Sequence, residues 1–198
     1  MNFSDGTAED GIFYGTSVGE DPTASWNVAF EGDPARRSGA LCDPSLKNCP
    51  DFPMMGFNTN WIVINTNDFY AGTLLPEVAV IGRQAAECTG TTNITRFKDS
   101  SLRLASPAET YHSAGNADPD AATLYLVERE NQNLGQVELF QITGTPAAPV
   151  LNTANPTTIT GPSGWQQPPS PAGQLGTSVT INVVDDRVFS AVVRNGYL

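Results

Sequence analysis

Residues 49–69 read CPDFPMMGFNTNWIVINTNDF, and the apolar run WIVIN at Trp61–Asn65 inside this stretch decides the fold class. Trp, Ile and Val favour strands, whereas the Pro, Gly and Asn residues before the run are typical of turns. A short apolar run bounded by turn residues is typical of a strand that is buried on both faces. The stretch therefore predicts a buried β-strand that is entered through a proline-containing loop.

The same pattern recurs along the chain, while helical periodicity is nearly absent. Strands are predicted at Ser25–Phe30, Trp61–Asn65, Glu77–Gly82, Asn93–Phe97, Thr123–Glu128, Gln136–Thr143, Ser178–Val184 and Val188–Arg194. Short polar connections at Gln84–Thr92, Asn131–Gly135 and Asp185–Arg187 predict hairpins between neighbouring strands. Nothing here requires a crossover helix, so the chain is predicted to be all-β and largely antiparallel.

A loose internal repeat suggests how these strands are arranged. A proline-containing loop precedes a buried strand three times, and Trp61, Leu124 and Ile181 are equivalent positions spaced by 63 and 57 residues. Such periods are typical of four-stranded propeller blades, because one small sheet cannot cover both of its faces and stacks on the next. We therefore predict a single domain over residues 1–198, an incomplete β-propeller of stacked four-stranded antiparallel sheets. Its repeats lie around 25–103, 104–160 and 161–198, the last one truncated, and a two-sheet β-sandwich is the alternative.

Three segments also resemble a known family. The run Cys49–Phe69 is similar to a blade opening of bacterial exported β-propellers of the sialidase-like superfamily, in which Cys-Pro-Asp-aromatic-Pro leads to a Gly, a strand and Asn-x-Phe. Residues 123–146, TLYLVERENQNLGQVELFQITGTP, resemble the outer strands of such a blade, and residues 165–198 resemble the next opening. The resemblance implies a propeller and an extracellular or periplasmic location. The Asp-box pattern Ser-x-Asp-x-Gly-x-x-Trp is absent, and about three blades are present where rings usually need about six or seven.

The net charge and the absence of certain motifs reduce the classes of partner and cofactor that are expected. The formal net charge of −11 repels phosphate backbones and anionic lipid, so neither nucleic acid nor a membrane surface is expected as a partner. No run approaches the roughly 18 apolar residues of a membrane span. P-loop, GxGxxG, HExxH and paired CxxC motifs are absent, no GxSxG motif is recognised either, and no cofactor is predicted.

The cysteines predict one disulfide. Cys42 and Cys49 bracket the loop CDPSLKNC, whose turn-forming residues can close a small disulfide ring in an oxidising compartment. In a reducing compartment the same two residues would be free thiols. Cys88 has no neighbour in the sequence to pair with.

Few residues are candidates for catalysis or metal binding. His112, the only histidine, lies in a polar loop with no nucleophile at a telling spacing, which favours a solvated side chain. Asp118 and Asp120 flank a proline, and two carboxylates in one loop can bind Ca²⁺, although ordinary turn chemistry is preferred.

Exposed aromatic side chains are the remaining candidates, because they can stack on sugars. Trp61 lies in an apolar strand and is predicted to be core. Trp165, in the loop GPSGWQQPP, is the best candidate for a ligand-stacking residue, with packing against the prolines as the simpler role; Trp26 is considered beside it.

These patterns favour a non-catalytic propeller module that presents loops for protein or glycan binding. The alternatives are part of a sialidase-like glycoside hydrolase, which rests on fold resemblance alone, and a structural exoprotein segment. An incomplete ring leaves sheet edges bare, so self-association through open edges is also expected.

Overall fold

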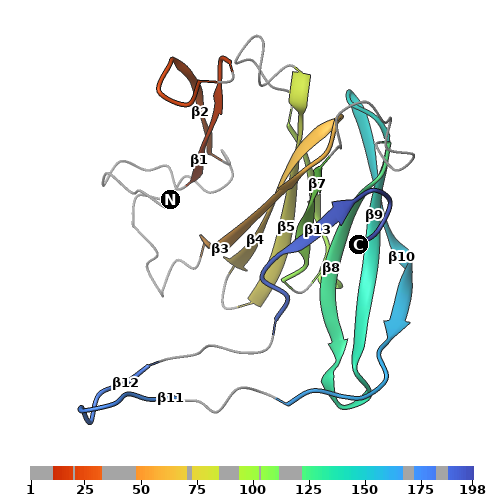
Figure 1. Cartoon of the computed structure of the whole chain (residues 1–198). Helices are drawn as coiled ribbons and strands as arrows, with labels where there is room; N and C mark the ends of the chain where they lie inside the picture. Colours follow the sequence, from red (N-terminus) through yellow and green to blue (C-terminus); the bar gives the residue numbers. More distant parts are fainter. Residues whose placement is uncertain are drawn as a thin grey trace.

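The computed structural model describes residues 11–19, 21–32, 48–70, 73–84, 94–102, 104–111, 122–166, 172–181 and 187–198. Here the chain forms β-strands joined by turns, which confirms the all-β prediction (Figure 1). The strands are β1 (Gly11–Ser17), β2 (Trp26–Gly32), β3 (Asn48–Phe57), β4 (Trp61–Tyr70), β5 (Thr73–Gly82), β6 (Ile94–Lys98), β7 (Ser106–Tyr111), β8 (Leu124–Asn131), β9 (Gln136–Thr145), β10 (Ala148–Thr160), β11 (Ala172–Gly173), β12 (Thr180–Ile181) and β13 (Ala191–Arg194).

Most of these strands belong to one mixed sheet. Its order is β10-β9-β8-β7-β3-β4-β5-β6, and β13 pairs with β7 beside this path. The pairs β3–β7 and β13–β7 are parallel, and the other pairs of this sheet are antiparallel. The sheet curls until β10 and the turn after β6 meet, where the Thr153 hydroxyl donates to Asp99 Oδ2 at 2.6 Å. The result is a nearly closed, barrel-like sheet.

The predicted stack of four-stranded blades is therefore wrong. Propeller blades are separate sheets that face one another, whereas here β7 hydrogen-bonds on one side to β3 and on the other to β8. The same continuity distinguishes the fold from the two separate sheets of the sandwich alternative. The supposed repeat positions also differ, because Trp61 and Leu124 are fully buried while Ile181 on β12 is 49% exposed.

Two of the predicted hairpins are confirmed. Asn131–Gly135 joins β8 to β9 through a 3₁₀ turn, in which the Asn131 side chain caps the amides of Asn133 and Leu134 and Gly135 adopts a left-handed φ of 64°. The predicted connection Gln84–Thr92 falls between β5 and β6, which pair antiparallel. The hairpin at Asp185–Arg187 is wrong, because β12 pairs with β11 and β13 pairs in parallel with β7.

The main core lies inside the curled sheet. Side chains alternate between the two faces of a strand, so every second residue of the central strands points inward. The inward, fully buried set is Trp61, Val63, Val78, Val80, Leu102, Ala105, Leu124, Leu126, Phe140 and Ile142, with Phe97 and Leu151 packed against it. These residues come from both halves of the sheet, so burying them holds the two halves together.

A second apolar cluster lies on the outer face of β4 and β5. Ile62, Ile64 and Ile81 form it, and the partly buried Tyr14 of β1 packs against them. All four apolar residues of the run WIVI are buried, as predicted for a strand covered on both faces. The β1–β2 hairpin thereby covers part of the outer face, and this contact positions the candidate site described below.

Three strands that the sequence analysis missed contain prolines. In β3 the register shifts between Asp51 and Met54, and the intervening Phe52 has a positive φ of 53°. In β10 it shifts between Asn152 and Thr157, next to Pro156. Proline cannot donate to a ladder and is tolerated at bulges, which fits Pro53 and Pro156. Pro50 of β3, Pro149 of β10 and Pro107 of β7 instead occupy regularly paired positions.

The contact between β10 and the turn after β6 gives a pH-dependent expectation. The hydrogen bond from Thr153, with that from the Ser101 amide, lowers the pKa of Asp99 below its ordinary 3.8. A lowered folded-state pKa stabilises the fold above 3.8, and this contribution disappears as the pH falls through the lower folded value. We expect Thr153→Val to cost about 1 kcal/mol at pH 7, and the cost to shrink towards pH 3. Urea denaturation at several pH values measures it.

The control for this experiment is Thr157→Val on the same strand. Thr157 is exposed, and among the described residues no carboxylate hydrogen-bonds to it, so Thr157→Val makes the same chemical change without breaking a bond to a carboxylate. Its effect on the free energy of unfolding should not vary with pH. A Thr153→Val cost that is equal at pH 7 and pH 3 would contradict the role given to Asp99.

Candidate binding pocket

A pocket of about 260 Å³ lies between the β1–β2 hairpin and the outer face of the sheet. The hairpin contributes residues 14–17 of β1 and Trp26 of β2. The sheet contributes Met55, Phe57 and Ile62, and Arg83 follows β5. The lining is predominantly apolar, with hydroxyl and guanidinium groups at a few points, which is the usual composition of a ligand site.

Trp26 forms one wall of the pocket, and its orientation is fixed. Its side chain is 50% exposed, and the indole Nε1 donates to the carbonyl oxygen of Pro22 at 3.0 Å. The turn that carries Pro22 is itself held by Asp21, whose Oδ1 accepts from the Thr23 amide at 2.8 Å and from its hydroxyl at 2.7 Å. These bonds, the hydroxyl bond foremost, lower the pKa of Asp21. The exposed ring is therefore presented in a set position at neutral pH.

Gly15 provides the space beside this ring. A Cβ at Gly15 would lie 3.4 Å from Trp26 Cε3 and 3.5 Å from the carbonyl oxygen of Asn27. Gly15 pairs with Val28, and Ser17, two residues further along β1, pairs with Trp26 across the hairpin. An aromatic ring that lies against a cross-strand glycine shields its backbone, so the Gly15–Trp26 contact stabilises the hairpin and the pocket wall together.

Arg83 provides a positive charge in the pocket lining. Its Nη1 donates to the Asn58 carbonyl oxygen at 3.0 Å, and its amide donates to the Asn60 carbonyl oxygen at 2.9 Å. The guanidinium also lies over the Phe57 ring, 5.6 Å from the centroid. Asn58 is fully buried, and its Oδ1 accepts from the amides of Asn60 and Trp61 at 2.9 Å each. The cation is thus anchored on the rigid β3–β4 turn.

Tyr111 extends the aromatic surface beyond the pocket. Its ring meets Phe57 edge to face at a centroid distance of 5.5 Å, and its hydroxyl donates to Glu109 Oε2 at 2.6 Å. This hydrogen bond, more than burial or the Glu109 charge, raises the pKa of Tyr111. Tyr14, Phe57 and Tyr111 come from three distant parts of the sequence, which is why the sequence analysis did not place them together.

The sequence-predicted site residues fall elsewhere. Trp61 is fully buried, as predicted. Trp165 is half-buried, and its amide donates to the Gln132 carbonyl oxygen at 3.0 Å, so it lies against the β8–β9 turn and away from the pocket lining. Its role as a ligand-stacking residue stays a prediction.

The remaining candidates are not placed by the structure. Cys42, Cys88, His112, Asp118 and Asp120 lie outside the described residues. The backbone of Cys49 pairs with Phe69 in the β3–β4 ladder, but its side chain is not among those described. The Cys42–Cys49 disulfide therefore stays a prediction.

One motif escaped the sequence analysis. Residues 15–19 read Gly-Thr-Ser-Val-Gly, which matches G-x-S-x-G, and Ser17 lines the pocket. In hydrolases this motif forms a sharp strand-to-helix turn that exposes a nucleophilic serine. Here Ser17 ends strand β1 of a β-hairpin, and the backbone continues to β2. The context of a nucleophile elbow is missing, so we assign no catalytic role to Ser17.

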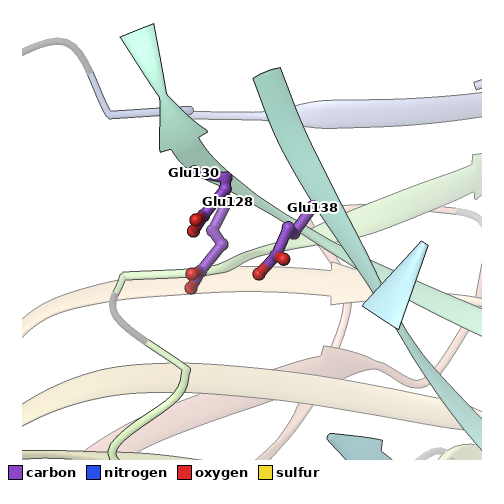
Figure 2. A group of neighbouring side chains, drawn as sticks. All are labelled: Glu128, Glu130 and Glu138. Carbon is purple, nitrogen blue, oxygen red and sulfur yellow. The ribbon is translucent and has the colours of Figure 1, made fainter. Parts of the chain in front are cut away.

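Three carboxylates gather on the β8–β9 hairpin, as Figure 2 shows: Glu128, Glu130 and Glu138. Each offers an oxygen atom within 4.8 Å of the others, and Glu128 is buried while Glu130 is exposed. Burial, and then the charge of Glu130, raise the pKa of Glu138. Ca²⁺ takes about six to eight oxygen ligands, so three glutamates on one hairpin fall well short of a complete site.

Comparison adds no relative from which a role could be transferred. No family model, curated protein or solved structure matches this chain. Within the part of the chain that the structure describes, no helix has the length and hydropathy needed to cross a membrane.

Proposed function

We propose that this chain is a non-catalytic binding module that takes a carbohydrate at the pocket between the β1–β2 hairpin and the main sheet. The observation that carries this proposal is the half-exposed Trp26 ring, held by the bond from its Nε1 to Pro22. The extracellular or periplasmic location implied by the family resemblance belongs to the same proposal.

The lining suits a sugar ring. A pyranose buries its apolar C–H face on an aromatic ring and directs its hydroxyls outward to polar groups. Trp26, Tyr14 and Phe57 supply aromatic surface, and Thr16 and Arg83 supply polar groups at its margin. Pockets that enclose drug-sized ligands measure about 300–1,000 Å³. At about 260 Å³, this pocket suits a single ring at the end of a glycan.

The absence of acidic residues from the pocket favours binding over hydrolysis. Most glycosidases need two carboxylates that flank the scissile bond. Among the described residues, the pocket lining includes no Asp or Glu, and the three glutamates of Figure 2 belong to the β8–β9 hairpin. The alternative of a sialidase-like hydrolase has less support than a binding role, because its fold analogy relied on propeller blades.

The test is a panel of immobilised glycans, followed by calorimetry on the ligands that bind. We expect Trp26→Ala to weaken binding at least about tenfold, because it removes the stacking surface. Trp26→Phe, which keeps a ring but loses the Nε1 donor, should weaken binding less.

The matched control is Trp165→Ala. This variant should bind as the wild type does, since Trp165 lies against the β8–β9 turn. Binding that depends on Trp165 and not on Trp26 would move the site to the residue predicted from sequence. A protein ligand in place of any glycan would replace the proposed ligand class.

A further inference from the structure

The hairpin of β11 and β12, residues 172–181, is an arm that extends away from the main sheet (Figure 1). Only Ala172 with Ile181 and Gly173 with Thr180 are paired in its ladder. Two further bonds hold its turn, from Gln174 Nε2 to the Val179 carbonyl oxygen at 3.3 Å and from the Val179 amide to Thr177 Oγ1 at 3.1 Å. An isolated two-stranded hairpin is marginally stable in water.

The arm exposes apolar side chains. Leu175 is 105% exposed, Val179 64% and Ile181 49%. Among the described residues, none packs over these three side chains closely enough to bury them. The arm would therefore gain stability by adding to another sheet and covering them.

The main sheet offers two edges, and they differ. The β6 edge is short and carries Arg96 and Lys98, charges of the kind that protect an edge from pairing. The β10 edge is longer, contains no charged residue, and exposes Val150 and Ile159 at 56% and 45%. Pro149 and the bulge near Pro156 interrupt its first part, so Thr157–Thr160 is its regular segment, and no strand within the described ranges pairs with its outer side.

The lack of charge on both elements matters because the chain carries a net charge of −11. Two copies repel one another over most of their surfaces. Residues 172–181 and 148–160 both contain no Asp, Glu, Lys or Arg. Two copies can therefore meet at these elements without placing like charges in contact.

The arm is directed away from the edge of its own sheet. After β10, the Gly161 amide donates to the Gly135 carbonyl oxygen at 2.8 Å, and the Trp165 amide donates to Gln132. Gly164 lies so close to Asn133 that a Cβ there would be 2.4 Å from its carbonyl oxygen. These contacts tie the chain to the β8–β9 turn, on the side of β10 opposite its open edge.

We propose that the β11–β12 arm of one copy adds to the Thr157–Thr160 segment of β10 in a second copy of this chain. Main-chain hydrogen bonds would extend the sheet, and Leu175 and Val179 would be covered against apolar residues such as Ile159. This inference does not depend on the proposed carbohydrate pocket, which lies between the β1–β2 hairpin and the main sheet.

Light scattering on a sizing column, over a series of concentrations, provides the first test. We expect a dimer of the 21.0 kDa chain. Leu175→Lys on the arm and Ile159→Lys on the edge should each raise the dimer dissociation constant at least about tenfold. Val18→Lys, at a 59% exposed position outside both elements, is the matched control and should leave the dimer intact.

A second test locates the contact. A photo-crosslinker at position 175, in a mixture of light and isotopically heavy chains, should join light to heavy peptides containing residues 157–160. A wild type that is monomeric throughout the series overturns the proposal. So does a dimer that both lysine variants leave unchanged, or crosslinks confined to single chains.

Discussion

Gly56→Ala is expected to lower the free energy of unfolding by about 3 kcal/mol or more, because β3 and β7 approach too closely at this point for any side chain. A Cβ on Gly56 would lie 2.5 Å from the carbonyl carbon and oxygen of Pro107 and 2.6 Å from the carbonyl oxygen of Ala108. All three atoms belong to the backbone and cannot turn aside as a side chain can. The strands would have to separate where β7 joins the two halves of the sheet.

Urea denaturation measures this effect, and Gly19→Ala is the control. A Cβ at Gly19 meets nothing within 4 Å, so the control should change stability by no more than about 0.5 kcal/mol. A Gly56→Ala protein as stable as the control would show that the close approach of β3 to β7 is wrong.

The second large effect on stability is expected at Leu124, compared with Ile181, which the supposed internal repeat would make an equivalent position. Leu124→Asp places a carboxylate among fully buried apolar residues and should cost several kcal/mol, about 4 or more. Ile181→Asp places the same group on the exposed arm and should change stability by no more than about 0.5 kcal/mol. Both are measured by denaturation at low protein concentration, where the proposed pairing of the β11–β12 arm with a second copy does not contribute. Equal costs at the two positions would restore the repeat and contradict the structure.

Local sequence patterns predicted the central strands well. The run at Trp61–Asn65 and those that became β5, β8 and β9 are apolar enough to identify as strands. Strands β3, β7 and β10 were missed because Pro53, Pro107 and Pro156 argue against strands. In the structure Pro53 and Pro156 lie at register shifts, and Pro107 lies in the short pairing of β7 with β8.

Strand pairing could not be predicted in the same way. The parallel pairs of β7 with β3 and β13 join segments that are far apart in the chain. No turn motif in the sequence indicates such pairs, because they are not connected by a hairpin. The supposed repeat followed from spacing alone, and spacing does not determine which strands become neighbours.

The candidate pocket could be predicted only in part from the sequence. Aromatic side chains were considered, but Trp165 was preferred to Trp26, because nothing in the sequence shows that Pro22 would hold the indole or that Gly15 would lie beside it. Arg83 joins the pocket only because the β3–β4 turn binds it, which is a property of the folded sheet.

The parallel pairing of β13 with β7 also has a kinetic consequence. Ala191 pairs with Ala108, so this ladder closes over a long stretch of chain that contains β8, β9 and β10. Closing so long a loop loses chain entropy before the contacts between β13 and β7 can stabilise it. Topologies rich in such non-local pairings therefore fold slowly. The hairpins can form early, whereas the pairing of β13 with β7 forms later. During that interval the β7 edge is open to foreign strands, so the chain is most vulnerable to misassembly before β13 arrives.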